Sequence, residues 1–161
     1  MRIRLVVADQ SEARFYELRS HDTVDLVGRL ADPLAHLHDR DLVSDRPGRK
    51  FDRAPLIAGR RGATAHHATG GEHSARKHEA ECFARRIAAE LERARQCGDF
   101  EGLIVMSGPG FLGLLRAALS EPTRAAVVAE VPKDLLHEGI DAILRHLPQL
   151  PATATARPSA P

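Results

Sequence analysis

The chain has 161 residues, 43% of them apolar, and it is long enough for one domain with a buried core. With five Phe, one Tyr and no Trp, that core must consist mainly of Leu, Val, Ile and Ala, a composition that suits a sheet covered by helices. Because 23 Lys and Arg stand against 22 Asp and Glu, the overall charge excludes a uniformly basic or acidic protein, and only local charge can indicate a partner.

The N-terminal part of the chain is predicted to form three strands. The apolar run Ile3 to Ala8 is the first, and alternating apolar residues predict the second from Ala13 to Leu18 and the third from Val24 to Leu30. Short polar turns between them predict a meander. The first run is too short for a signal peptide or a membrane span, so we expect a cytoplasmic protein with no membrane partner.

Helices and strands alternate in the C-terminal half. Ser74 is expected to cap a long helix that ends near Gln96, with Gly98 as its stop. The elements predicted after it are a buried strand at 103–107, a helix at 111–119, a strand at 125–130 and a helix at 133–147. The order βββ, long loop, αβαβα predicts the α/β class. We expect one domain over residues 1–148 and a disordered, Pro- and Ala-rich tail over 149–161.

The connection between the third strand and the long helix, residues 32–73, is unusually long and is therefore either functional or disordered. It contains a dense run of basic residues with Asp52 as the only acid, a local net charge of +5: Arg46, Arg49, Lys50, Arg53, Arg60 and Arg61. Such a run is typical of contacts to nucleic-acid phosphates. The alternative is a solvated arm whose arginines pair with aspartates of the same loop. Phe51 is its one aromatic residue, so base stacking is not supported.

Gly70 and Gly71 close this loop and are followed by Glu72 and His73. Adjacent glycines can take positive φ and approach another molecule closely, and the free N–H groups at a helix start favour an anion. Arg76 adds a positive charge in the next turn. The competing interpretation is a flexible loop that ends in an ordinary helix cap.

Two other kinds of site compete for attention. The imidazoles, carboxylates and thiol around the long helix start could supply metal ligands (His66, His67, His73, His78, Glu79, Glu81, Cys82), but no Cys-x-x-Cys or His-Glu-x-x-His pattern supports them. Residues 108–113 form a G-x-G-x-x-G after a strand, yet the upstream meander does not fit a dinucleotide-binding domain. We therefore predict no metal and no cofactor.

Three groups of residues together resemble the bacterial family called "protein required for attachment to host cells". They are Asp32-Pro33, His38 to Arg49 and Lys77 to Ala84, and residues 111–116 and 128–135 resemble its C-terminal half. The family is similar to the middle domain of archaeal and eukaryotic peptide-chain release factors. That resemblance implies a mixed five-stranded sheet and a Gly-Gly-Gln tip that assists hydrolysis of peptidyl-tRNA.

In this chain Gly70 and Gly71 match the two glycines of the tip, but Glu72 stands where the family similarity implies glutamine. A carboxylate only accepts hydrogen bonds and is repelled by phosphates, so we expect weak or no hydrolysis. The function predicted is binding of ribosomal RNA or tRNA, with no role for DNA. The alternatives are a non-enzymatic protein-interaction module that affects attachment indirectly, and a histidine-based or metal-dependent hydrolase of small molecules. Enzymatic activity and the oligomeric state are left open.

Overall fold

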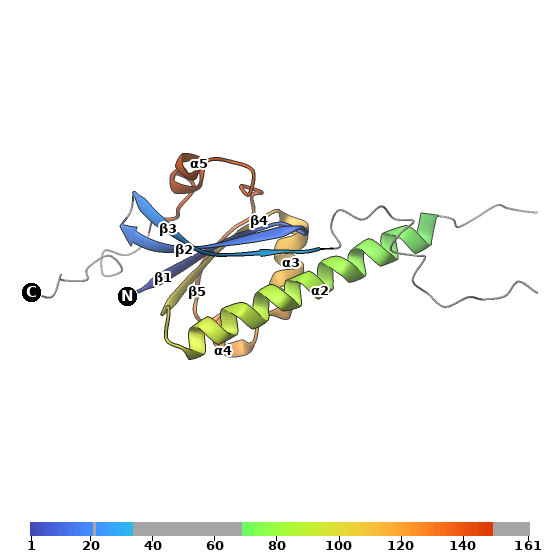
Figure 1. Ribbon diagram of the computed structural model, residues 1–161, viewed down its shortest axis with the longest axis horizontal. Coiled ribbons are helices and arrows are strands. Elements are labelled where there is room, and N and C mark those ends of the chain that lie inside the picture. Colours follow the sequence, from blue (N-terminus) through green and yellow to red (C-terminus); the bar gives the residue numbers. More distant parts are fainter. Residues whose placement is uncertain (21, 34–68, 150–161) are drawn as a thin grey trace, which may run out of the picture.

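One mixed sheet of five strands, in the order β3-β2-β1-β4-β5, forms the centre of the fold (Figure 1). The first three strands, β1 (Ile3–Ala8), β2 (Glu12–Ser20) and β3 (Thr23–Ala31), form the antiparallel meander predicted from the sequence. On the other side of β1, β4 (Gly102–Ser107) and β5 (Val127–Val131) continue the sheet in parallel. The computed structural model describes residues 1–20, 22–33 and 69–149.

Helices cover both faces of this sheet. The 28-residue α2 (Thr69–Gln96) lies across one face together with α3 (Pro109–Ala118), and α5 (Ile140–Arg145) lies on the opposite face (Figure 1). The predicted α/β class and its mixed five-stranded sheet are therefore confirmed. Within the described part of the chain, no helix is both long and apolar enough to cross a bilayer.

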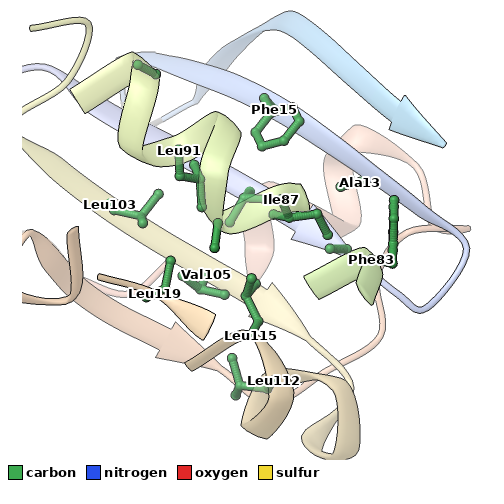
Figure 2. Close-up of a cluster of buried hydrophobic side chains, with 14 of the residues drawn as sticks. Ala13, Phe15, Phe83, Ile87, Leu91, Leu103, Val105, Leu112, Leu115 and Leu119 are labelled. Atoms are coloured by element: carbon green, nitrogen blue, oxygen red, sulfur yellow. The ribbon is translucent and has the colours of Figure 1, made fainter. Parts of the chain in front are cut away.

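The larger apolar core lies between α2, α3 and the sheet. Phe83, Ile87 and Leu91 recur at helical spacing along α2 and are almost completely buried, as the periodicity predicts. Figure 2 shows them directed at Phe15 of β2 and at side chains of the central strands. Leu115 of α3 belongs to the same cluster. Since β4 is buried on both faces, its continuous apolar sequence is also explained.

The long helix begins earlier than predicted. The sequence predicts Ser74 as its cap, but α2 starts at Thr69, so Gly70 and Gly71 lie in the first turn rather than in the loop. A glycine costs a helix only about 1 kcal/mol, and a helix that is already nucleated extends readily. The predicted end is right, because Gly98 has φ +72° and follows the last turn.

The prediction of a helix over residues 133–147 is wrong for its first half. The helix is confined to Ile140–Arg145, and the chain before it forms turns in which the Asp134 carboxylate accepts a hydrogen bond from the Leu136 N–H at 3.3 Å. Gly139, a poor helix former, stands at the N-cap. Leu135 and Leu136 are nevertheless buried in the second core cluster.

A short helix that the sequence did not reveal, α4 (Glu121–Ala125), precedes β5 and delays its start to Val127. Ser120 caps it by accepting from the Thr123 N–H. The Ser120 and Thr123 hydroxyls both donate to the Glu92 carboxylate of α2, which also accepts from the Arg95 guanidinium at 2.7 Å. These donors hold the pKa of Glu92 well below its usual range.

We expect Glu92→Gln to lower the melting temperature at neutral pH. A lowered pKa in the folded state stabilises the fold above the ordinary carboxyl pKa, and this contribution is lost as the pH falls toward the folded value. The difference between variant and wild type should therefore shrink in acid, as thermal unfolding at several pH values would reveal. Glu90→Gln is the matched control, because Glu90 contacts only the exposed Arg93 in the described contacts. Equal effects of the two changes would contradict the interpretation.

Candidate functional site

Three ionisable side chains meet where β3 ends against α2. Asp32 directly follows β3, and its backbone N–H donates to the Ser11 carbonyl at 2.8 Å, which fixes the chain there. The Asp32 side chain is only 1% exposed, and its Oδ1 lies 3.6 Å from Nη1 of Arg86. Arg86 also reaches the Ala31 carbonyl at 3.5 Å and lies over the ring of Phe83. The buried carboxylate therefore lies against a guanidinium that α2 supplies.

Glu79 is the third member of this group, which we call the carboxyl cluster (Asp32, Glu79, Arg86). It lies two helical turns before Arg86 and so on the same side of α2. Burial, and then the charge of Asp32 and a hydrogen bond to it, raise the pKa of Glu79 above its usual range, while His78 and Arg86 oppose the rise. Burial and the nearby Asp32 carboxylate therefore favour the neutral form of Glu79.

A thiol lies one turn from this cluster. Sγ of Cys82 is 3.6 Å from Nε2 of His78 and accepts a hydrogen bond from Arg85 at 3.1 Å. His78 and Cys82 therefore share a helix side, as residues four positions apart do in a helix. Among the residues that the structure describes, however, no three His, Cys, Asp or Glu side chains gather as metal ligands. His66, His67 and the side chain of His73 lie outside them.

Most of the predicted site lies beyond what the structure describes. The basic run of the loop falls wholly outside the described residues: Arg46, Arg49, Lys50, Arg53, Arg60 and Arg61. Gly70, Gly71, Glu72 and His73 are placed in the backbone of α2, but nothing is described of their side chains. Arg76 is described and is exposed on α2. The predicted RNA-binding and catalytic roles therefore stay predictions.

The N-terminal turns of α2 extend past the ends of the strands (Figure 1). In residues 75–86 all four basic side chains are exposed, and we call them the basic α2 surface: Arg76, Lys77, Arg85 and Arg86. The two acidic residues of the same stretch, Glu79 and Glu81, are half-buried. The positive charge of this end therefore faces solvent more fully than the negative charge does.

Of the three glycines in the G-x-G-x-x-G at 108–113, Gly108 lies at the turn from strand to helix. Gly108 is the N-cap of α3, and Gly110 and Gly113 lie inside that helix. None of the three has a positive φ, since the described glycine with that geometry is Gly98.

Sequence reasoning missed the carboxyl cluster. It assigns Asp32 to the start of the loop and considers Glu79 only as a metal ligand. Two features of the sequence could have indicated it. Asp32 is a polar residue at the end of a strand, where a helix that crosses the sheet can contact it, and Glu79 and Arg86 lie on one side of α2. The sequence alone did not reveal that α2 crosses the sheet at this point.

We expect Glu79→Gln to stabilise the fold at neutral pH. For a carboxyl whose pKa is raised on folding, the stabilising contribution is present below the unfolded pKa and is lost as the pH rises through the folded value. Gln retains the neutral form at every pH. Denaturant unfolding should therefore show a higher midpoint for the variant at pH 7 and a vanishing difference near pH 4. A variant less stable than wild type at pH 7 would show that attraction to Arg86 outweighs the repulsion from Asp32.

Comparison with known proteins gives a family and distant similarity to solved structures. The chain spans 31% of a solved structure described as an archaeal protein, with 88% of this chain covered, 11% identity and a TM-score of 0.42. No curated protein matches it. The model of a family described as "Protein required for attachment to host cells" matches residues 5–147, from β1 to just beyond α5. Because this match extends over most of the 161 residues, the chain belongs to the family of proteins required for attachment to host cells.

Proposed function

We propose that this member of the host attachment family binds structured RNA, either ribosomal RNA or tRNA, through the loop before α2 and the basic α2 surface. It acts as a release-factor-like domain with weak or no peptidyl-tRNA hydrolysis. Its effect on attachment to a host is then indirect and follows from its action on translation.

The observation that carries this proposal is the distribution of charge on the described part of α2. Arg76, Lys77 and Arg85 are exposed on α2, whereas Glu79 is half-buried. In the sequence, the loop that leads into this helix has a net charge of +5 over residues 46–62. Guanidinium and ammonium groups in such density suit a phosphate backbone, whose charge density favours release of counterions.

Weak hydrolysis follows from the chemistry of Glu72. A tetrahedral intermediate of ester hydrolysis develops an oxyanion, which hydrogen-bond donors stabilise. An ionised carboxylate offers no donor and repels that charge, whereas a glutamine amide both donates and accepts at neutral pH.

Ribosome binding tests the proposal directly. The purified full chain should co-sediment with ribosomes at low salt and be released as salt rises, because ionic contacts to phosphates weaken steeply with salt. Failure to bind ribosomes or RNA even at low salt would overturn the proposal and favour a protein partner for the loop.

We expect Gly71→Ala to uncouple stability from function. Since Gly71 lies in the first turn of α2, alanine should strengthen the helix by up to about 1 kcal/mol, while its Cβ obstructs close approach to RNA. Release of labelled peptide from loaded ribosomes measures the activity.

Glu72→Gln is the change expected to raise peptide release above the wild-type background. The matched control is the Gly71→Ala, Glu72→Gln double variant, which should lose this gain. Strong wild-type release that survives Gly71→Ala would place the chemistry elsewhere.

A further inference from the structure

The two cysteines of the chain, Cys82 and Cys97, have different surroundings. Cys97, just after α2, is exposed, and its sulfur has no hydrogen bond within the described part of the chain. Cys82 is half-buried, and side chains from the turns before and after it reach its sulfur. Nε2 of His78 is 3.6 Å from Sγ, and Nη2 of Arg85 donates to Sγ at 3.1 Å. Cys82 is therefore the thiol with a base and a cation at its sulfur.

His78 and Arg85 supply the two groups that make a thiol a nucleophile. The species that attacks in sulfur chemistry is the thiolate, which forms when a base accepts the thiol proton. With Nε2 unprotonated, the imidazole of His78 is within reach of that proton. The guanidinium of Arg85 then lies against the negative sulfur and stabilises it, since a guanidinium stays charged at every working pH.

The charge around this thiol favours an anionic reaction partner. Arg85 forms no ion pair with the described residues, so no neighbouring carboxylate neutralises it. Lys77 is exposed on the same helix, whereas Glu81, next to Cys82, is half-buried. A reagent that carries carboxylates is therefore attracted to the sulfur, and a cationic reagent is repelled.

We propose that Cys82 is a nucleophilic thiol that exchanges with small disulfides bearing carboxylates and so becomes a mixed disulfide. The His78 imidazole accepts the Cys82 proton, and Sγ attacks one sulfur of the reagent to form a new S–S bond. The S–S bond of the reagent breaks, and its electron pair leaves on the second sulfur, which takes the proton from the imidazolium. A thiol and a disulfide give a mixed disulfide and a new thiol, so no further oxidant is needed. The reaction takes place without RNA and stands apart from the proposed RNA binding.

Single-cysteine forms of the full chain test this assignment. Cys97→Ser leaves only Cys82, and Cys82→Ser leaves only Cys97. The reduced proteins are mixed with the anionic disulfide dithiobis(nitrobenzoate), whose coloured leaving thiolate reports the rate. We expect Cys82 to react at least about tenfold faster than Cys97 at neutral pH, although Cys97 is more exposed. The two rates should converge when both proteins are unfolded in guanidinium chloride, because the contacts to His78 and Arg85 are then lost.

His78→Gln and Arg85→Gln, each made in the Cys97→Ser protein, should slow the reaction of Cys82 because they remove the base and the cation. Lys77→Gln is the matched control, since it removes an exposed positive charge of the same stretch that has no described contact to Cys82, and it should slow the reaction less than Arg85→Gln does. Melting temperatures verify that each variant is folded.

The class of reagent is tested with oxidised glutathione, which is anionic, and cystamine, which is cationic. Mass spectrometry should find the glutathione adduct of the wild-type chain on Cys82, and the folded protein should favour glutathione over cystamine more strongly than the unfolded chain does. Equal preference in the two states would overturn the anionic class. Equal rates for the two cysteines of the folded protein, or a fast Cys82 that neither His78→Gln nor Arg85→Gln slows, would overturn the site itself.

Discussion

Phe83→Ala is expected to destabilise the fold by about 3–5 kcal/mol, the largest effect on stability expected here for a single substitution. Phe83 is fully buried between α2 and the sheet, and its ring lies 6.1 Å from that of Phe111 on α3. Truncation would remove the packing that joins α2 to α3 and would leave a cavity on the sheet. The guanidinium of Arg86, 5.6 Å from the ring centre, would also lose its aromatic partner.

Denaturant unfolding monitored by circular dichroism would measure this destabilisation. Phe83→Leu should cost much less because most of the apolar volume remains, and Ala89→Ser, an exposed change on the same helix, should stay within about 0.5 kcal/mol of wild type. A loss of stability for Phe83→Ala no larger than that of Ala89→Ser would mean that α2 does not pack on the sheet as described.

Replacement of four basic loop residues by alanine is expected to have the largest effect on function. These are Arg49, Lys50, Arg60 and Arg61. For each phosphate that the variant no longer neutralises, the plot of log affinity against log salt should become less steep by about 0.7–0.9, so four such phosphates would change the slope by about 3. Filter binding of a labelled RNA at several salt concentrations gives this slope, and the decrease in affinity should be greatest at low salt.

The control for this prediction removes four positive charges elsewhere: Arg19, Arg29, Arg93 and Arg145, all exposed on the described body of the protein. If both quadruple variants change the slope equally, binding depends on net charge and the loop has no special role. If neither changes it, the basic run does not contact phosphate.

The sequence predicted the sheet and the main helices because their apolar periods are unambiguous. Ile3 to Ala8 and the stripe through Phe83, Ile87 and Leu91 each fit one period over enough residues to decide the element. The predicted start of α2 is wrong because the low helix propensity of Gly70 and Gly71 indicated a loop. A helix that is already formed and packed on the sheet extends by further residues at little cost, and this outweighs the low propensity of the two glycines. The turns before α5 were missed because the backbone of Leu135 and Leu136 is irregular although their side chains are buried. Irregular backbone produces no periodic apolar pattern in the sequence.

The candidate site was less predictable than the fold. The contact between Asp32 and Glu79 joins residues 47 positions apart and depends on where α2 crosses the sheet, which no local pattern encodes. Charge density along the loop, in contrast, is a property of composition and can be read directly. For this reason the sequence indicates a class of partner for the loop, while the carboxyl cluster required the tertiary arrangement.

The register between β2 and β3 shifts between Phe15 and Tyr16, which leaves Val27 without a counterpart in β2. β3 is an edge of the sheet, and its Leu26 and Val27 are 44% and 45% exposed, so a regular strand here would be a template for pairing with another chain. A bulge bends and twists an edge strand and disrupts the spacing of its outward N–H and C=O groups. The irregularity at Val27 thus protects the molecule against aggregation by strand addition at this apolar exposed edge.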